Sequence, residues 1–372
     1  MVTPNPVAAR PTVSIIVPAR NEEACLEACL RSLQAQAGVS FEIIVVDDGS
    51  TDRTREIAES FPAVRVIDAD HLPSGWTGKT NAMLTGARVA QGEWLLFTDA
   101  DTVHLPGSLA GAVAEAREHA AALLSYSPEQ EVHGFWHKSV MPVIFAELAA
   151  TYRPSQVSNP ASPAAAANGQ YLLISREAYD AVGGHAPIAA SLLEDVALAR
   201  AVKASGRKIF FRYGREAVRT RMYRSFSELK EGWTKNLVLL FPSALRLALL
   251  RLLEFLLIVG SAALAIRGAV DGQGKAALIT GGIAVILIVL FFKRIRRAHF
   301  SWDADGFALF GLPVFSYLLL RSHIFHQQGG VLWKGRIYPV ATSAHGEVVA
   351  QVREGHGFSR AKPPAKVSGV SR

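Results

Sequence analysis

The first half of the sequence alternates short apolar runs with helical patterns, and this alternation restricts the fold more than any other feature. Apolar runs at 13–18, 41–46 and 64–68 are each followed by a polar loop and a segment with helical spacing. Such units predict an α/β fold with a mostly parallel, doubly wound sheet and right-handed crossovers. Because ligands bind these sheets at the carboxyl ends of strands, a site is expected in the loops that follow them. The predicted helices cover 24–35, 53–61 and 79–90.

A fourth apolar run ends in two aspartates that are one residue apart. As a strand over 95–102, it places Asp99 and Asp101 on the same side, because side chains two residues apart in a strand share a face. Two carboxylates that converge in this way suit Mg²⁺ or Mn²⁺, ions that commonly hold phosphates. A surface turn is the alternative interpretation of this pair taken alone, since aspartate is common in turns.

Polar residues also follow the first two strands. The first strand runs into Pro18-Ala19-Arg20-Asn21-Glu22, and the second into Asp47-Asp48-Gly49-Ser50-Thr51-Asp52. The carboxyl ends of parallel strands meet at one edge of a sheet, so these loops and the Asp99–Asp101 segment are expected to share one cleft. Ser50 or Thr51 is expected to cap the helix that follows.

Lys79 lies in a segment that resembles a phosphate-binding P-loop without matching it. In Gly75-Trp76-Thr77-Gly78-Lys79-Thr80 the first glycine of the motif would stand at position 73, which is Pro73. Lys79 at a helix start would neutralise a diphosphate, or it would be an ordinary solvated lysine. No G-x-G-x-x-G follows any strand, so the sequence gives no support for dinucleotide binding.

The chain beyond Asp101 adds helices, strands and a second acidic pair. The unusually apolar helix at 135–152 is either core packing or a hydrophobic acceptor groove near a membrane. Glu194 and Asp195 open a later helix, where they either complement its dipole or supply a general base. The remaining predicted elements are helices at 106–119 and 177–182, strands at 122–126 and 169–174, and a loop at 159–167.

Together these residues resemble the inverting family-2 glycosyltransferases, whose catalytic domain has the Rossmann-like GT-A fold. The resemblance covers residues 13 to about 236. Its matching segments are Pro18 to Glu22, Val45 to Asp52, Lys79 with Asn81 and Ala82, Asp99-Ala100-Asp101, Asn168-Gly169 and Glu194-Asp195.

The resemblance implies a role for each matching residue. Asp48 would hold the uracil of a UDP-sugar, and Asp101 would bind the Mg²⁺ or Mn²⁺ that bridges the diphosphate. Asp195, beside Glu194, would take the proton from an acceptor hydroxyl during a single inverting displacement. The implied nucleotide-sugar site comprises Pro18, Arg20, Glu22, Asp48, Lys79, Asp99 and Ala100.

One departure from the family pattern favours a single-transfer enzyme. Processive synthases of the family carry Q-x-x-R-W, whereas Leu229-Lys230-Glu231-Gly232-Trp233 keeps only the tryptophan. Arg219 and Arg221 would supply cations for the diphosphate instead, or serve a structural role. The Gly75-Trp76 loop and Trp333-Lys334-Gly335-Arg336 also resemble the membrane-bound subset associated with hopanoid and carotenoid glycosylation.

Three apolar segments in the last third predict a membrane region. Those at about 247–266 and 276–292 are long enough to span a bilayer, and Arg251 and Glu254 in the first are expected to pair. The third, at about 306–325, is either a span or an element broken at Gly311-Leu312-Pro313. The net charge of +7 comes with basic clusters beside these segments, as in Lys293 to Arg297, which favours an anionic membrane surface over nucleic acid.

These observations predict a multi-pass protein of the inner (cytoplasmic) membrane. An N-terminal extension (1–12) without a signal peptide leads to a cytoplasmic catalytic domain (13–236) with reduced thiols at Cys25 and Cys29. A membrane region (237–325) and a basic tail (326–372) follow, and the end of the tail is predicted to be disordered.

The predicted activity is transfer of a sugar from a UDP-sugar to a lipid or lipid-linked acceptor. A processive polysaccharide synthase and a non-catalytic, sugar-nucleotide-binding membrane scaffold are the alternatives. The sequence does not identify the sugar or the acceptor.

Overall fold

A seven-stranded sheet forms the centre of the N-terminal part of the molecule. The computed structural model describes residues 10–328, 330–333 and 336–339. The strand order is β3-β2-β1-β4-β8-β6-β9, and all strands are parallel except β8, which runs antiparallel to both neighbours. The mostly parallel sheet that the sequence predicts is therefore confirmed. Its strands are β1 (Val13–Ala19), β2 (Phe41–Asp47), β3 (Val64–Asp68), β4 (Trp94–Phe97), β6 (Leu123–Ser127), β8 (Leu172–Ser175) and β9 (Ile209–Tyr213).

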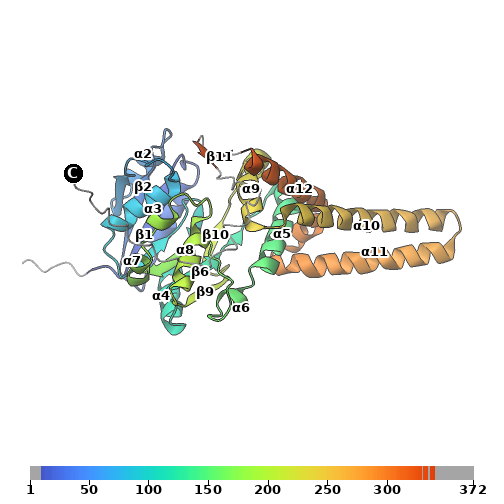
Figure 1. Ribbon diagram of the computed structural model, residues 1–372, viewed down its shortest axis with the longest axis horizontal. Helices are drawn as coiled ribbons and strands as arrows, with labels where there is room; N and C mark the ends of the chain where they lie inside the picture. The colour runs from blue at the N-terminus through green and yellow to red at the C-terminus, as the bar shows by residue number, and fades with distance from the viewer. Residues whose placement is uncertain (1–9, 329, 334–335, 340–372) are drawn as a thin grey trace, which may run out of the picture.

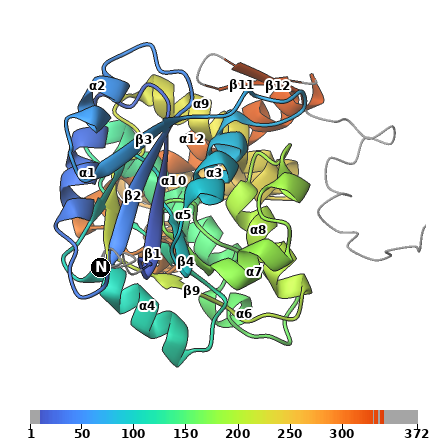
Figure 2. The same cartoon turned by 90° about the vertical axis from the view of Figure 1, so that its left-hand side faces the viewer.

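Helices cover both faces of this sheet. Successive side chains of β1 enter different cores, Ile15 the one with α1 and α4, and Ile16 the one with α3 and α8, as the period of a strand requires. Figure 2 shows α1 and α2 on one side of the sheet and α3 and α8 on the other. The helices are α1 (Leu26–Gln34), α2 (Thr54–Glu59), α3 (Gly78–Val89), α4 (Ser108–Glu118), α7 (Arg176–Ala181) and α8 (Glu194–Ala204).

A second, three-stranded sheet follows the aspartate pair. It consists of β5 (Thr102–His104), β10 (Val218–Thr220) and β7 (Glu129–Gln130), in the order β5-β10-β7. The predicted strand over 95–102 is confirmed only in its first part, because β4 ends at Phe97 and the next four residues form a turn before β5. Asp99 and Asp101 therefore lie in a turn, and the alternation of a strand does not set their directions.

The expected cap of α2 is also wrong. Neither Ser50 nor Thr51 caps this helix. Arg53 occupies the N-cap position, and its side chain makes no capping hydrogen bond to the backbone of the first turn. Asp52 serves the first turn instead, because its Oδ1 accepts hydrogen bonds from the backbone N–H (3.0 Å) and the hydroxyl (2.5 Å) of Thr54.

Three helices pack beside the sheet domain and form a separate core. They are α5 (Gly134–Thr151), α9 (Phe226–Leu240) and α12 (Trp302–Gln327), and their buried side chains include Ile144, Trp233 and Phe315. α12 continues through Gly311 to Pro313, so of the two alternatives for this segment the continuous helix is the one that forms. Gly311 permits close contact with α5, since a Cβ there would lie 1.9 Å from the Ser139 carbonyl oxygen. The short elements nearby are α6 (Pro154–Val157), η1 (Ala186–Ile188) and η2 (Arg296–Ala298).

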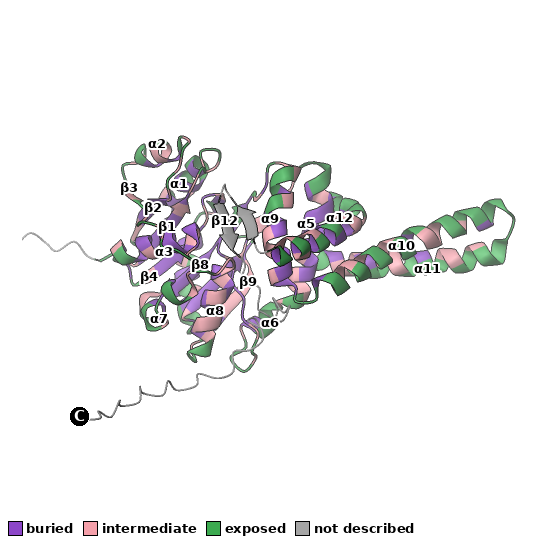
Figure 3. Cartoon of the chain, turned by 45° about the horizontal axis from the view of Figure 1, so that its top comes forward, coloured by how far each residue is buried: buried purple, intermediate pink, exposed green. Residues whose placement is uncertain are grey.

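A long helical hairpin projects from these helices (Figure 1). It consists of α10 (Ala244–Val270) and α11 (Gly274–Ile295), and most of its surface is exposed (Figure 3). By length and composition, α10, α11 with η2, and α12 are three helices that could cross a membrane, in agreement with the predicted apolar segments. α12 differs from the hairpin because much of it packs against α5 and α9.

The end of the chain contributes one more hairpin. β11 (Gly330–Trp333) pairs antiparallel with β12 (Arg336–Pro339). Lys334, Gly335 and the tail from 340 onward, including its predicted disorder, lie outside the described residues, as does the extension at 1–9.

A buried cluster of four charges joins the hairpin to α5. The predicted pair of Arg251 and Glu254 is confirmed at 2.8 Å, and Arg294 of α11 binds the same carboxylate at 2.7 Å. Glu147 of α5 forms ion pairs with both arginines, with Nε–Oε1 distances of 2.9 Å to Arg251 and 3.3 Å to Arg294. Each side chain is less than one-fifth exposed, with values from 7% to 19%. Breaking a buried pair leaves an uncompensated charge, so this cluster is costly to disrupt.

We therefore expect Glu147→Ala to destabilise the protein by about 3–5 kcal/mol, because it leaves two buried guanidinium groups with one carboxylate between them. The measurement is thermal unfolding of the detergent-solubilised protein. Glu27→Ala is the matched control, since its ion pair with Arg31 is exposed (56% and 71%) and should contribute little. Equal losses for both variants would contradict a special role for the cluster.

Candidate active site

One large cavity lies where the predicted site residues meet. It has a volume of about 1750 Å³ and opens at the carboxyl ends of β1, β2 and β4. The starts of α3 and α8 and the loop before β8 complete its wall. The cavity brings together every residue that the sequence assigned to the site: Pro18, Arg20, Glu22, Asp48, Lys79, Asp99, Ala100, Asp101, Glu194 and Asp195.

The loops after β1 and β2 are joined into one unit. Arg20 Nη1 donates to the Asp48 carbonyl oxygen (2.5 Å), and the Glu22 backbone N–H donates to Thr54 Oγ1 (2.7 Å). Asn21, at a positive φ of 54°, accepts from the Thr51 backbone N–H through its side chain (2.8 Å). Asparagine tolerates this left-handed conformation better than most residues, which explains its place in the turn.

The two adjacent aspartates of the second loop do different work. Asp47 is buried, and its Oδ1 accepts from the backbone N–H (3.0 Å) and the hydroxyl (2.6 Å) of Ser50, which shapes the turn. Asp48 lines the cavity, and its carboxylate lies 3.9 Å from Arg20 Nη1. The first aspartate therefore builds the loop, and the second faces the site.

A buried network holds the turn that contains Asp99 and Asp101. Thr102 Oγ1 donates to the Asp99 carbonyl (2.8 Å), and Thr220 Oγ1 donates to the Asp101 carbonyl (3.2 Å). His104 Nε2 lies 3.2 Å from Thr102 Oγ1, and burial lowers the pKa of His104 to about 3, so the ring is neutral. The sequence analysis missed these residues, because β5 and β10 are too short to be recognised by their pattern.

Lys79 forms the electrostatic centre of the cavity. Its Nζ lies 2.7 Å from Asp99 Oδ1 and 2.8 Å from Glu194 Oε1, so it is not the solvated lysine of the alternative interpretation. Burial opposes its charge, but the two carboxylates hold the pKa of Lys79 well above its ordinary value. In return, and against the effect of burial, Lys79 holds the pKa of Glu194 below its ordinary value. Glu194 is therefore ionised and committed to this ion pair.

Asp195 is the carboxylate whose environment suits proton transfer. Its Oδ2 accepts from the Gly169 backbone N–H (2.8 Å), which orients the group. Desolvation and the adjacent Glu194 charge raise the pKa of Asp195 to about 6, although Lys79 acts in the opposite direction. A carboxylate whose pKa is raised toward the working pH is a better general base.

Gly169 packs closely against the charged side chains. A Cβ at this position would lie 3.2 Å from Lys79 Nζ and 3.4 Å from Glu194 Oε1. A larger residue would therefore require the Lys79 ammonium to shift by a few tenths of an ångström.

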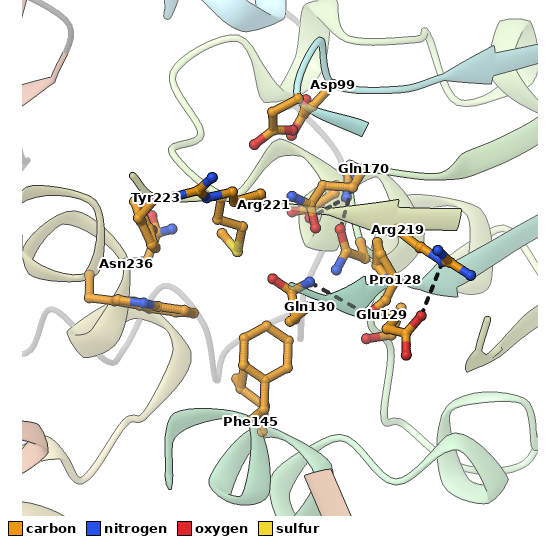
Figure 4. Close-up of a pocket in the computed structure, with 18 of the residues that line it drawn as sticks. Asp99, Pro128, Glu129, Gln130, Phe145, Gln170, Arg219, Arg221, Tyr223 and Asn236 are labelled. Carbon is orange, nitrogen blue, oxygen red and sulfur yellow. Dashed lines mark hydrogen bonds and ion pairs between the residues drawn. The ribbon is translucent and has the colours of Figure 1, made fainter. Parts of the chain in front are cut away.

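The far wall of the cavity carries further polar residues. Arg219 forms an ion pair with Glu129 (3.2 Å), and Arg221 lines the cavity nearby. Figure 4 shows Asp99 and Phe145 on opposite sides of the pocket, with Gln130 and Gln170 between them. Lys235 of α9 also lines the cavity, and burial lowers its pKa to about 8. No motif in the sequence pointed to Lys235.

The donor set fits a hard divalent cation only as a partial shell. Asp101 and Asp99 supply carboxylates in one turn, but Asp99 is already paired with Lys79. Among the described residues, no group of three or more His, Cys, Asp or Glu side chains gathers to hold a metal. Mg²⁺ commonly binds through one or two carboxylates together with phosphates and water, so the site fits a cation that arrives with a diphosphate.

The thiols behave as the sequence predicts. Cys25 and Cys29 form no disulfide in the described part of the chain, and Cys29 is buried beneath the Asp99–Asp101 turn. Burial raises the pKa of the Cys29 thiol to about 12, so it remains protonated.

Part of the chain matches a known protein family. The family described as Glycosyl transferase family 2 matches residues 14–183. A 4,4'-diaponeurosporenoate glycosyltransferase from Staphylococcus aureus is 30% identical over 233 residues, an alignment that covers 60% of each chain. The chain thus spans about three-fifths of the length of this relative.

A solved mannosyltransferase structure shares the architecture. A mannosyltransferase, PcManGT from Pyrobaculum calidifontis, in complex with GDP-Man and Mn²⁺, has a TM-score of 0.50 at 19% identity, over 85% of this chain and 87% of that chain. TarS 1–349 from S. aureus, in complex with UDP-GlcNAc, has a TM-score of 0.43 at 17% identity, over 89% of this chain and 97% of that chain. The fold is that of the GT-A glycosyltransferases, in agreement with the prediction. Residues 14–183 match glycosyl transferase family 2, in agreement with the resemblance.

The raised pKa of Asp195 predicts how stability depends on pH. Because its folded pKa lies above the ordinary value of 3.8, its contribution to stability is present below that value and is lost as the pH rises through about 6. We expect Asp195→Asn to raise the unfolding temperature at pH 8 relative to the parent, with no gain near pH 4. The measurement is thermal unfolding in detergent across this range.

Asp52 offers a control of opposite sign. Although burial works against its charge, hydrogen bonds from Thr54 lower the pKa of Asp52, so its stabilisation is present at high pH and lost in acid. Asp52→Asn should therefore lower the unfolding temperature at pH 8. A loss of stability at pH 8 in both variants would refute the raised pKa of Asp195.

Proposed function

We propose that this protein transfers a sugar from a UDP-sugar to a lipid or lipid-linked acceptor at the membrane, with inversion at the anomeric carbon. The carrying observation is the separation of roles among three carboxylates in one cavity. Lys79 forms ion pairs with both Glu194 and Asp99, whereas Asp195 has a pKa raised to about 6. A family-2 glycosyltransferase domain gives this arrangement its chemical context.

The donor would bind in the half of the cavity formed by the first two loops. Asp48 and Arg20 lie where the base and ribose would be held, with Pro18 and Glu22 beside them. Lys79, Asp99 and Ala100 stand between these loops and Glu194, which suits the diphosphate and sugar. The resemblance of this residue set to UDP-sugar enzymes supports uridine as the base. The similar structure of PcManGT was solved with GDP-Man, so guanosine is the alternative base.

The transfer would be a single displacement. An acceptor oxygen attacks the anomeric carbon, the bond from that carbon to the diphosphate oxygen breaks, and the nucleoside diphosphate leaves with its electron pair. Asp195 takes the proton of an acceptor hydroxyl, and Gly169 N–H keeps the carboxylate in position. Attack from the face opposite the leaving group inverts the configuration.

A divalent cation, Mg²⁺ or Mn²⁺, would be held by Asp101 and would supply charge neutralisation of the leaving diphosphate. The Thr220 and Thr102 hydroxyls hold the backbone of this turn, so the Asp101 carboxylate is presented by a rigid support. Arg221 would add positive charge near the same group, whereas Arg219 is engaged by Glu129.

The acceptor would be reached from the lipid phase. Three helices could cross a membrane, and the S. aureus relative is named for glycosylation of 4,4'-diaponeurosporenoate. We infer a multi-pass protein of the inner membrane with its catalytic domain in the cytoplasm, supported by the basic residues from Lys293 to Arg297 at the end of α11. Anchoring confines the catalyst and the lipid to one plane.

Removing the cation ligand tests the donor half. We expect Asp101→Ala to abolish the stimulation of turnover by Mn²⁺, because its carboxylate would hold the cation against the diphosphate. The assay incubates purified protein with a panel of UDP-sugars, GDP-mannose and native lipid extract, followed by mass spectrometry of the lipids. Asp70→Ala is the control, since Asp70 pairs with Arg88 outside the cavity (2.7 Å). Unchanged Mn²⁺ stimulation in Asp101→Ala would refute this role.

Removing the base tests the acceptor half. We expect Asp195→Asn to lower the rate of transfer by at least about 100-fold while UDP binding persists. In the parent protein, the rate should rise as the pH passes about 6, because the base then loses its proton. Calorimetry with UDP and Mn²⁺ checks binding, and a pH series checks the rate. Full transfer by the Asp195→Asn protein would exclude the base assignment and would point to an acceptor that is already ionised. A parent protein that binds UDP but transfers nothing would favour the scaffold alternative.

A further inference from the structure

The cavity continues beyond the carboxylates into an apolar region. Three aromatic side chains line it there: Phe145 of α5, Trp233 of α9 and Phe300 from the segment before α12. The Phe145 ring centroid lies 6.1 Å from that of Trp233 and 5.8 Å from that of Phe300, both in edge-to-face arrangements. We call Phe145, Trp233 and Phe300 the aromatic trio.

We propose that the aromatic trio binds the long apolar chain of the acceptor, which enters beside the segment 296–301 at the base of the hairpin. This inference rests on the proposed function and deepens it. It assigns the acceptor to a chemical class: an amphiphile with one polar reacting group, a hydroxyl or a carboxylate, on an apolar chain.

The composition of this region fits such a chain. Leu148 of α5, Met222 and Leu240 line the same stretch of the cavity as the trio. Phe145 and Leu148 are only partly buried, although both lie on a helix that packs against a hydrophobic core. Apolar surface that faces an open cavity is stabilised when an apolar ligand covers it.

The trio is held in place from outside the cavity. Trp233 is buried (3% exposed), and its Nε1–H donates to the sulfur of Met141 on α5 (3.4 Å). Its ring also lies near Tyr223, with a centroid distance of 6.3 Å. Trp233, which is the single residue that remains of the Q-x-x-R-W pattern, lines the cavity wall.

The same helix carries both apolar and polar residues of the cavity wall. Lys235, Asn236 and Leu240 of α9 line the cavity together with Trp233. Lys235 interacts electrostatically with Glu194, Lys79, Asp99 and Asp195. An acceptor chain that rests on the aromatic trio would therefore direct its polar end past Lys235 toward Asp195.

Part of the cavity wall lies beside the end of the hairpin. Lys293, Arg296 and Arg297 line the cavity and are exposed, and they follow directly on the apolar part of α11. Arg296 is fixed by Asp305 (3.1 Å) and by the Trp302 ring, whose centroid lies 3.8 Å from its Cζ. Basic side chains at this level suit the anionic surface of a bilayer, from which an amphiphile would enter.

The test uses parinaric acid, a conjugated polyene carboxylic acid, as the probe, with the full chain in detergent micelles. Energy transfer from tryptophan to the probe reports binding. We expect Phe145→Ala and Phe300→Ala each to weaken probe binding by about ten-fold, because each removes an aromatic contact surface. Phe135→Ala and Phe310→Ala are the matched controls on α5 and α12, since both side chains are exposed (44% and 52%) and neither lines the cavity. The controls should bind the probe as the parent does.

Calorimetry with UDP and Mn²⁺ separates the possible failures. Weaker probe binding in the two cavity variants, with parent-like UDP binding, supports the proposal. Equal probe binding in all four variants overturns it, whether or not UDP binds. If UDP does not bind to the parent while the cavity variants still lose the probe, the donor assignment fails and the apolar site stands. If either alanine variant unfolds, Phe145→Leu and Phe300→Leu replace them, and these should lose a smaller part of the affinity.

Discussion

Lys79 places one ammonium group between two carboxylates from distant parts of the chain, and the geometry of the cavity depends on this contact. Asp99 comes from the turn after β4, and Glu194 from the first turn of α8. Without the ammonium, Asp99, Glu194 and Asp195 would bring several negative charges into one partly buried space, and each would raise the pKa of the others. With it, Asp99 and Glu194 are both paired with the ammonium, and Asp195 is left for proton transfer. A single lysine at the start of α3 thus sets the division of roles.

Local patterning predicts much of this structure. Apolar strands that end in polar loops gave β1, β2 and β3 in their correct places, because a buried parallel strand needs apolar side chains on both faces. The same rule brought Arg20, Asp48 and Asp99 to one edge of the sheet. The resemblance to a known family then added Asp195, whose role no local feature distinguishes from that of a helix-terminal carboxylate.

Contacts between distant segments are what the sequence does not reveal. The Asp99–Asp101 turn was predicted as a strand because its aspartates follow an apolar run; the hydroxyl of Thr220, more than one hundred residues away, holds the turn that forms instead. β5, β7 and β10 are two or three residues long, too short for an alternating pattern to be visible. The Arg251–Glu254 pair was predictable because its residues are three apart on one helix. Its partners Glu147 and Arg294 were not predictable, because they come from distant helices.

α5 connects the two halves of the molecule, and this explains why its sequence is apolar on nearly all sides. Phe145 and Glu147 are two residues apart, so they point to different sides of the helix. Phe145 faces the cavity, and Glu147 binds the arginines of the hairpin. Ile144 and Val143, which precede Phe145 on the same helix, pack in the helical core with α12. The charge cluster therefore fixes the hairpin against the helix that forms the cavity wall.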